Sequence, residues 1–196
     1  MQPSDSHPSG VQPPDVLHCD RIELRRWHAD MIEGLDRAIT ESREHLRPWM
    51  PFAATHDRAQ GEGFLAFAEK EWLAGEGYNY AILSDGVVVG SCGLHRRIGP
   101  HGLEIGYWLH HAWTGQGLAT MAAAALVRAA GELPGIDHVE IHHDEANVAS
   151  GAVARRLGFT EVARIVAPDR QAAPGETGVD LIWRLAVRAE ASAAPA

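Results

Sequence analysis

The sequence predicts an α/β fold in which a mixed, mostly antiparallel sheet of about six or seven strands carries helices on both faces. Two observations lead to this prediction. Strand-like runs at 78–84 and 87–94 flank Asp85-Gly86, a pair that readily adopts positive φ and makes a tight hairpin turn. After a third strand-like run at 103–109, helices and strands alternate along the chain. Antiparallel strands followed by such a crossover produce a mixed sheet between helical layers.

Before the hairpin, apolar periodicity predicts one strand and two helices, separated by a segment whose two prolines prevent a continuous helix. These elements are a strand at 21–25, a helix at 30–39, the proline-containing segment at 43–52 and a helix at 58–73. The longer helix is expected to bury an aromatic side formed by Phe64, Phe67 and Trp72.

After the hairpin, the predicted order is strand, helix, strand, helix, strand and strand. The ranges are 103–109, 117–130, 138–143, 148–157, 160–166 and 179–187. Gly158 stands where a left-handed glycine commonly ends a helix, which separates the second helix from the strand that follows it.

We expect one domain, residues 16–188, between two disordered ends. Residues 1–15 contain four prolines and no periodic apolar pattern, and the alanine-rich residues 189–196 lack such a pattern as well. A chain of 196 residues, 45% of them apolar, is long enough to bury a substantial core.

Composition and charge argue against several classes of function. The chain has 26 acidic and 17 basic residues and a net charge of -9, so its field repels nucleic acid and favours a cationic partner. No window approaches the roughly 18 apolar residues of a membrane helix, and the N-terminus lacks the features of a signal peptide. Cys19 and Cys92 have no metal or redox spacing, and the histidines are scattered. We therefore expect a cytoplasmic protein that binds no metal, nucleic acid or membrane.

The strongest ligand-binding signal lies between the strand at 103–109 and the next helix. The connecting loop contains Gly115 and Gly117 and opens directly into an apolar helix. Glycines let backbone amides approach a ligand, and the unpaired amides of a helix's first turn attract phosphate. Neither a Walker loop nor the dinucleotide fingerprint matches this spacing. A tight connection without any ligand would explain the same two glycines.

The segment 147–159 has a complete structural explanation when it is taken alone. Asn147 suits a helix N-cap, and Leu157-Gly158-Phe159 suits a helix end followed by a strand. By itself this pattern predicts a capped helix and no particular function.

Together, the two segments resemble the GNAT superfamily of N-acetyltransferases. The resemblance rests on Gly115-Gln116-Gly117-Leu118-Ala119, followed by Asn147-x-x-Ser150 and Leu157-Gly158-Phe159. The stretches at 46–51, 104–108 and 153–159 are similar to the branch that acetylates the N-termini of ribosomal proteins. The motifs keep the family's order and spacing over roughly residues 17–187.

The resemblance implies a GNAT fold whose central strands splay apart at the acyl-CoA site. Loop amides would hold the pyrophosphate of acetyl-CoA, the cosubstrate, and the splayed strand would pair with the pantetheine arm. The implied cofactor-binding residues are Leu109, Gly115, Gln116, Gly117, Leu118, Ala119, Thr120 and Asn147. Two positions depart from the family. Thr114 replaces the usual Arg or Gln of the loop, and Ala154 replaces a tyrosine that protonates the leaving thiolate in many members.

The transfer needs a neutral amine, a stabilised oxyanion and a proton for the departing thiolate. Because the ribosomal branch uses a serine as the acid, the resemblance implies this role for Ser150. Glu104, at the start of the splayed strand, is the candidate base, and an ordinary carboxylate at a sheet end is its alternative reading. Asp169 is a second candidate, since the branch places a carboxylate after the strand that follows Phe159.

We therefore predict an acetyl-CoA-dependent N-acetyltransferase that acts on a primary amine, with a peptide or protein N-terminus as the favoured acceptor. The acceptor would be shaped by residues 43–52 and 167–178. A small amine such as an antibiotic or polyamine, or transfer of a succinyl group, would use the same cofactor residues. A catalytically silent acyl-CoA-binding regulator is the alternative of another class, and only Ala154 favours it. Members of the branch often pair, so a homodimer is a further expectation.

Overall fold

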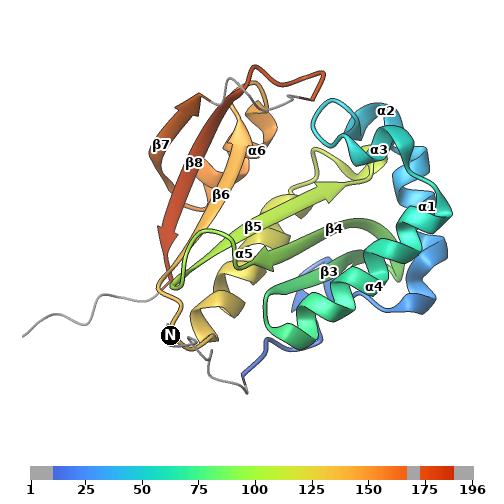
Figure 1. The fold of residues 1–196 in the computed structure, drawn as a ribbon, viewed down its shortest axis with the longest axis horizontal. Coiled ribbons are helices and arrows are strands. Elements are labelled where there is room, and N and C mark those ends of the chain that lie inside the picture. Colours follow the sequence, from blue (N-terminus) through green and yellow to red (C-terminus); the bar gives the residue numbers. More distant parts are fainter. Residues whose placement is uncertain (1–10, 167–172, 188–196) are drawn as a thin grey trace, which may run out of the picture.

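The computed structural model describes residues 11–166 and 173–187, which form a central sheet with helices packed on both of its faces (Figure 1). The sheet has eight strands in the order β1-β2-β3-β4-β5-β6-β8-β7. They are β1 (Val16–Cys19), β2 (Ile22–Arg26), β3 (Gly77–Ser84), β4 (Val87–His95), β5 (Gly102–Leu109), β6 (His138–Asp144), β7 (Thr160–Val166) and β8 (Val179–Ala186). Only β5 and β6 pair in parallel among the described strands, so the predicted mixed, mostly antiparallel sheet is confirmed.

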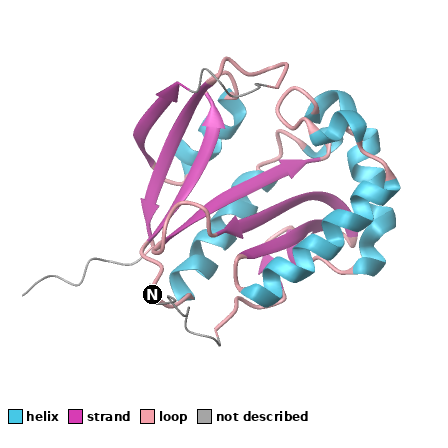
Figure 2. Cartoon of the chain, viewed as in Figure 1, coloured by secondary structure: helices cyan, strands magenta, loops and turns pink. Residues whose placement is uncertain are grey.

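A helix forms at each position where the sequence predicts one, and the structure adds two short helices and two 3-10 turns. Figure 2 shows the helices and strands. The helices are α1 (Ile32–Glu41), α2 (Arg43–Leu46), α3 (Phe52–Thr55), α4 (Arg58–Ala74), α5 (Leu118–Glu132) and α6 (Val148–Arg156), with 3-10 turns η1 (Ala29–Met31) and η2 (His111–Trp113). The prolines of the segment 43–52 lie between α2 and α3 and prevent a continuous helix, as expected, while the two short helices themselves were not predicted.

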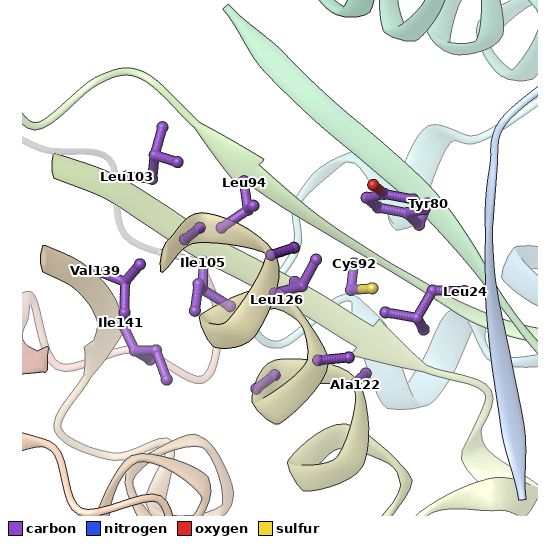
Figure 3. Packing of buried hydrophobic residues seen from close by; sticks show 14 of the residues in the cluster. Leu24, Tyr80, Cys92, Leu94, Leu103, Ile105, Ala122, Leu126, Val139 and Ile141 are labelled. Carbon is purple, nitrogen blue, oxygen red and sulfur yellow. The ribbon is translucent and has the colours of Figure 1, made fainter. Parts of the chain in front are cut away.

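Two apolar clusters fix the layers. On one face, α5 packs Ala122 and Leu126 against Leu94, Leu103 and Ile105 of the sheet (Figure 3). On the other face, α1 and α4 pack against β3 and β4. Because neighbouring residues of a strand point to opposite faces, residues 103 and 105 face α5 while residue 104 faces the other way.

Three details differ from the sequence-based expectation. The short edge strand β1 was not predicted, since four residues beside a proline-rich stretch carry little periodic signal. Phe67 was expected on the apolar side of its helix but is 52% exposed. The buried stripe of α4 runs along Gly61, Leu65, Ala68 and Trp72, and Phe67 lies outside it.

The third difference concerns the N-terminal lead predicted for residues 1–15. Residues 1–10 and the predicted tail at 189–196 lie outside the described residues. From Gln12 onward, however, the chain contacts the domain. The Gln12 amide donates to the Trp72 carbonyl at 2.9 Å, and the Tyr80 hydroxyl donates to the Pro14 carbonyl at 2.9 Å. Gln12 and Pro14 therefore belong to the packed structure, because their side-chain and backbone groups find partners on α4 and β3.

The hairpin prediction is confirmed: Asp85 and Gly86 have φ of 50° and 76° between β3 and β4. In the part of the chain that the structure describes, no helix has both the length and the apolar character needed to cross a membrane.

Candidate active site

A cleft of about 1020 Å³ opens where β5 and β6 part. Their parallel pairing is limited to 102–104 on β5 and 138–140 on β6, and beyond Glu104 and Glu140 the two strands diverge (Figure 1). On its other side, β5 stays paired with β4 as far as Leu109. The backbone of 105–109 therefore has one edge turned toward the cleft, where an extended ligand can bond to it. The predicted splay of the central strands is confirmed.

The glycine loop forms one wall of this cleft and positions the start of α5. Gly115 and Gly117 have φ of 73° and 80°, the left-handed conformation that glycine adopts at little cost. Gly117 is the N-cap of α5, and no side chain caps this end. The first-turn amides thus lack intrahelical partners and lie at the positive end of the helix dipole. These features fit a bound phosphate, as the sequence predicts.

A positive charge reaches this loop from a distant part of the chain. The Arg21 guanidinium, in the turn between β1 and β2, donates to the Gln116 carbonyl at 2.7 Å and lines the cleft. Thr114, which replaces the usual Arg or Gln, uses its hydroxyl to bond the His111 carbonyl at 2.9 Å. Sequence reasoning missed Arg21, because 95 residues separate it from Gln116 and no local motif marks it.

The opposite wall is the first turn of α6. Asn147 is its N-cap, as predicted, and its side chain accepts from the Ser150 amide at 3.2 Å. The Ser150 hydroxyl lies 2.8 Å from the hydroxyl of Tyr107 on β5, which also donates to the Ser150 carbonyl at 3.3 Å. Burial raises the pKa of Tyr107 to about 12, although the hydrogen bond with Ser150 acts in the opposite direction. Tyr107 therefore stays protonated and can act as a donor across the neutral pH range.

The resemblance places at residue 154 the tyrosine that many family members use as the acid. Ala154, at the corresponding position, is completely buried in the apolar core. A phenol at this site would have to displace core side chains. Tyr107 brings a phenol to Ser150 from the sheet instead, a contact that sequence reasoning did not anticipate because the two residues lie on different elements.

A row of charged side chains crosses the face of the sheet turned away from α5, at the point where the strands part. Arg97 holds both carboxylate oxygens of Glu104, at 2.7 and 2.6 Å. On β6, Glu140 accepts from Arg184 at 2.7 Å and from His142 at 2.6 Å. Burial raises the pKa of Glu140, but the hydrogen bonds from His142 and Arg184 outweigh it, so the pKa lies below its ordinary value.

The far end of the cleft is shaped by two segments that meet. The Gly175 amide donates to the Pro48 carbonyl at 2.9 Å. Asp144, at the end of β6, accepts from the amides of Thr177 and Gly178 at 2.9 and 2.8 Å. Burial raises the pKa of Asp144, but these bonds dominate and lower it to about 2. The carboxylate thus remains ionised and fixes the loop before β8.

Most of the residues selected from the sequence line this one cleft. The eight candidates for cofactor binding do so, namely Leu109, Gly115, Gln116, Gly117, Leu118, Ala119, Thr120 and Asn147. Glu104 and Ser150 line it as well. The side chain of Leu118 is buried in the core, so only its backbone is available to a ligand. Asp169 lies outside the described residues.

Residues 21–160 match the family model described as the acetyltransferase (GNAT) domain. The chain belongs to this family. The predicted recognition, fold and enzyme class are confirmed: the protein is a GNAT acetyltransferase, with acetyl-CoA as acetyl donor.

Individual relatives agree with this assignment. YdaF of Bacillus subtilis (strain 168), whose name provisionally places it among ribosomal N-acetyltransferases, is 28% identical over 145 residues, 72% of this chain and 79% of YdaF. The structure of RimL, a ribosomal L7/L12 α-N-protein acetyltransferase in complex with coenzyme A, has a TM-score of 0.80 at 19% identity, covering 87% of this chain and 97% of RimL. That of the microcin C7 self-immunity acetyltransferase MccE, in complex with acetyl-CoA and AMP, has a TM-score of 0.78 at 20% identity, covering 92% and 97%. These structural similarities establish the GNAT fold.

Proposed function

We propose that this GNAT enzyme transfers the acetyl group of acetyl-CoA to the α-amine of a peptide or protein. The observation that carries the proposal is the composition of one cleft. The glycine loop and Arg21 line it, as do the carboxylates of Glu176 and Asp180 and the apolar side chains of Trp49 and Met50. An acidic rim with apolar side chains suits a cationic N-terminus followed by a side chain. The names of YdaF and RimL are consistent with such an acceptor.

We assign the cofactor contacts as the resemblance implies. The backbone of 115–120 and the positive charge of Arg21 hold the pyrophosphate, while Leu109 and Asn147 contact the pantetheine arm. Ser150 protonates the departing sulfur. Glu104 is the base that the sequence offers for the proton of the amine, directly or through water, and Asp169 is the second candidate for this role. The amine nitrogen then bonds the acetyl carbon as the carbon–sulfur bond breaks.

Acetylation of a small amine is the second candidate, because the chain resembles MccE in fold almost as closely as it resembles RimL. The test is mass spectrometry after incubation with acetyl-CoA and a panel of N-terminal peptides, polyamines and aminoglycosides, with a parallel succinyl-CoA series. We expect peptides to gain one acetyl group faster than the small amines. Acetylation of the small amines alone would contradict the proposal, and binding without release of free thiol from any mixture would indicate a regulator.

Asn147→Asp separates capping from cofactor binding. Aspartate keeps the oxygen that accepts from the Ser150 amide but loses the amide donor. We expect an unchanged melting temperature and a KM for acetyl-CoA that rises about fivefold, near the value of one hydrogen bond. Asn147→Ala is the matched control, since it removes the cap and should cost about 1 kcal/mol of stability. Unchanged kinetics in Asn147→Asp would leave Asn147 a purely structural residue.

A further inference from the structure

The tautomer of His142 follows from its partner on β6. Its Nε2 atom lies 2.6 Å from Oε2 of Glu140. The pKa of Glu140 is lowered, so the carboxylate is ionised at neutral pH and can only accept a hydrogen bond. Nε2 must therefore carry the hydrogen. In the neutral imidazole this leaves Nδ1 with an unshared electron pair.

The Nδ1 atom faces a second carboxylate. It lies 3.7 Å from Oε2 of Glu104, beyond hydrogen-bonding distance. Nδ1 of His142 and Oε2 of Glu104 are both acceptors, and their separation leaves room for an N–H or O–H group to bind to them. Once Nδ1 is protonated, the cation lies between two carboxylates that stabilise its charge.

Among the groups of this row that can accept a proton, His142 has the most exposed side chain. Its side chain is 28% exposed, compared with 12% for Glu104 and 5% for Glu140. Both oxygens of Glu104 are already held by Arg97. Both carboxylates of this row are paired with arginines. Nδ1 of His142 is therefore the accessible position of the row that can take up a proton.

We propose that His142, in place of Glu104, is the catalytic residue that accepts the proton of the incoming amine at Nδ1, while Glu140 and Arg184 are positioning residues. The inference rests on the proposed transfer to an amine. As the nitrogen–carbon bond forms and the carbon–sulfur bond breaks, the amine proton moves to Nδ1 and the sulfur takes a proton from Ser150. The imidazolium then returns its proton to water, and Ser150 recovers one from water.

Several titratable and charged groups share this face with His142. They are His95, Arg97, Glu104, His138, Glu140, Asp144, Asp180 and Arg184. Burial, followed by the charge of Arg97, lowers the pKa of His95 to about 4, so it is neutral in the range of interest. Asp144 remains ionised there, as described above. A second imidazole of β6 on the same face, His138, lies 4.0 Å from Glu140 and provides the control.

The test compares His142→Gln with His138→Gln across pH 6 to 10, using whichever amine the acceptor panel shows to be acetylated. Glutamine can still donate to Glu140 but cannot take up a proton. We expect kcat/KM of His142→Gln to fall about tenfold to a hundredfold near pH 7, toward the lower end of the usual contribution of a general base. The deficit should shrink above about pH 8, where a free α-amine is already neutral. His138→Gln should retain the wild-type profile.

Two measurements do not depend on turnover. Nitrogen NMR of the imidazoles should place the hydrogen of neutral His142 on Nε2, and calorimetry should show unchanged acetyl-CoA affinity in His142→Gln. A wild-type kcat/KM in His142→Gln across the pH range, or a hydrogen on Nδ1 in the neutral form, would overturn the inference. Failure of the wild-type enzyme to acetylate any peptide would instead refute the proposed acceptor, because the small amines in the panel still test His142.

Discussion

Gly117→Glu is expected to weaken acetyl-CoA binding by about a hundredfold or more, equivalent to at least about 3 kcal/mol. The new carboxylate would lie at the N-cap of α5, where the unpaired amides attract a phosphate. There it brings both bulk and a like charge to the proposed pyrophosphate site. The domain should remain folded, because an acidic side chain at a helix N-terminus is favourable and offsets part of the cost of positive φ. Isothermal calorimetry with acetyl-CoA measures the effect.

The structure offers a matched control for the backbone strain. Gly135 also has a left-handed φ, 78° compared with 80° for Gly117, and a Cβ added at either position meets no atom within 4 Å. Gly135 does not line the cleft. Gly135→Glu should therefore lower the melting temperature at least as much but leave acetyl-CoA affinity unchanged. If Gly117→Glu binds acetyl-CoA as tightly as the wild type, the phosphate assignment is wrong.

Ser150→Ala is expected to lower kcat by roughly tenfold to a thousandfold, the effect of losing a positioned acid. The hydroxyl would stabilise charge that appears only as the sulfur departs, so its loss should affect turnover more than binding. Acetyl-CoA affinity should change little. The backbone amide of Ser150, and not its hydroxyl, bonds the Asn147 cap, so α6 should keep its N-terminal structure. Steady-state kinetics with a confirmed acceptor, together with thermal unfolding, provide the measurement.

Tyr107→Phe tests whether the phenol acts through Ser150. It removes the hydroxyl that lies 2.8 Å from the serine oxygen and keeps the ring. In the wild-type background it should lower kcat about threefold to tenfold, and in Ser150→Ala it should have almost no further effect. Because the pKa of Tyr107 is raised to about 12, its protonation should add no step to the profile below pH 10. A Ser150→Ala enzyme with wild-type turnover would exclude the serine as the required acid.

The parts of the site that the sequence predicted are those with a local cause. The Gly115–Gly117 loop depends on the backbone freedom of two glycines. The cap of α6 depends on one asparagine, three residues before the amide that it caps. The Asp85-Gly86 hairpin is equally local. Such features are specified within a few residues, so they can be recognised without knowing what packs against them.

The contacts that complete the site join residues far apart in the chain. Arg21 reaches Gln116 across 95 residues, Tyr107 reaches Ser150 across 43, and Arg184 reaches Glu140 across 44. No single segment contains a signal for these pairs. They depend on strand register and on which face each side chain occupies, which the sheet fixes only when the whole domain packs.

The sequence by itself determined the order of the longer elements, the glycine loop before α5 and the capped helix that carries Ser150, since backbone propensity and apolar periodicity act over a few residues. Only the tertiary structure decided where β5 and β6 part, which acid and base partners meet in the cleft, and that Phe67 is exposed while Ala154 is buried. These outcomes depend on the competition of all elements for one core, because a side chain's environment is set by distant neighbours as much as by its own residue type.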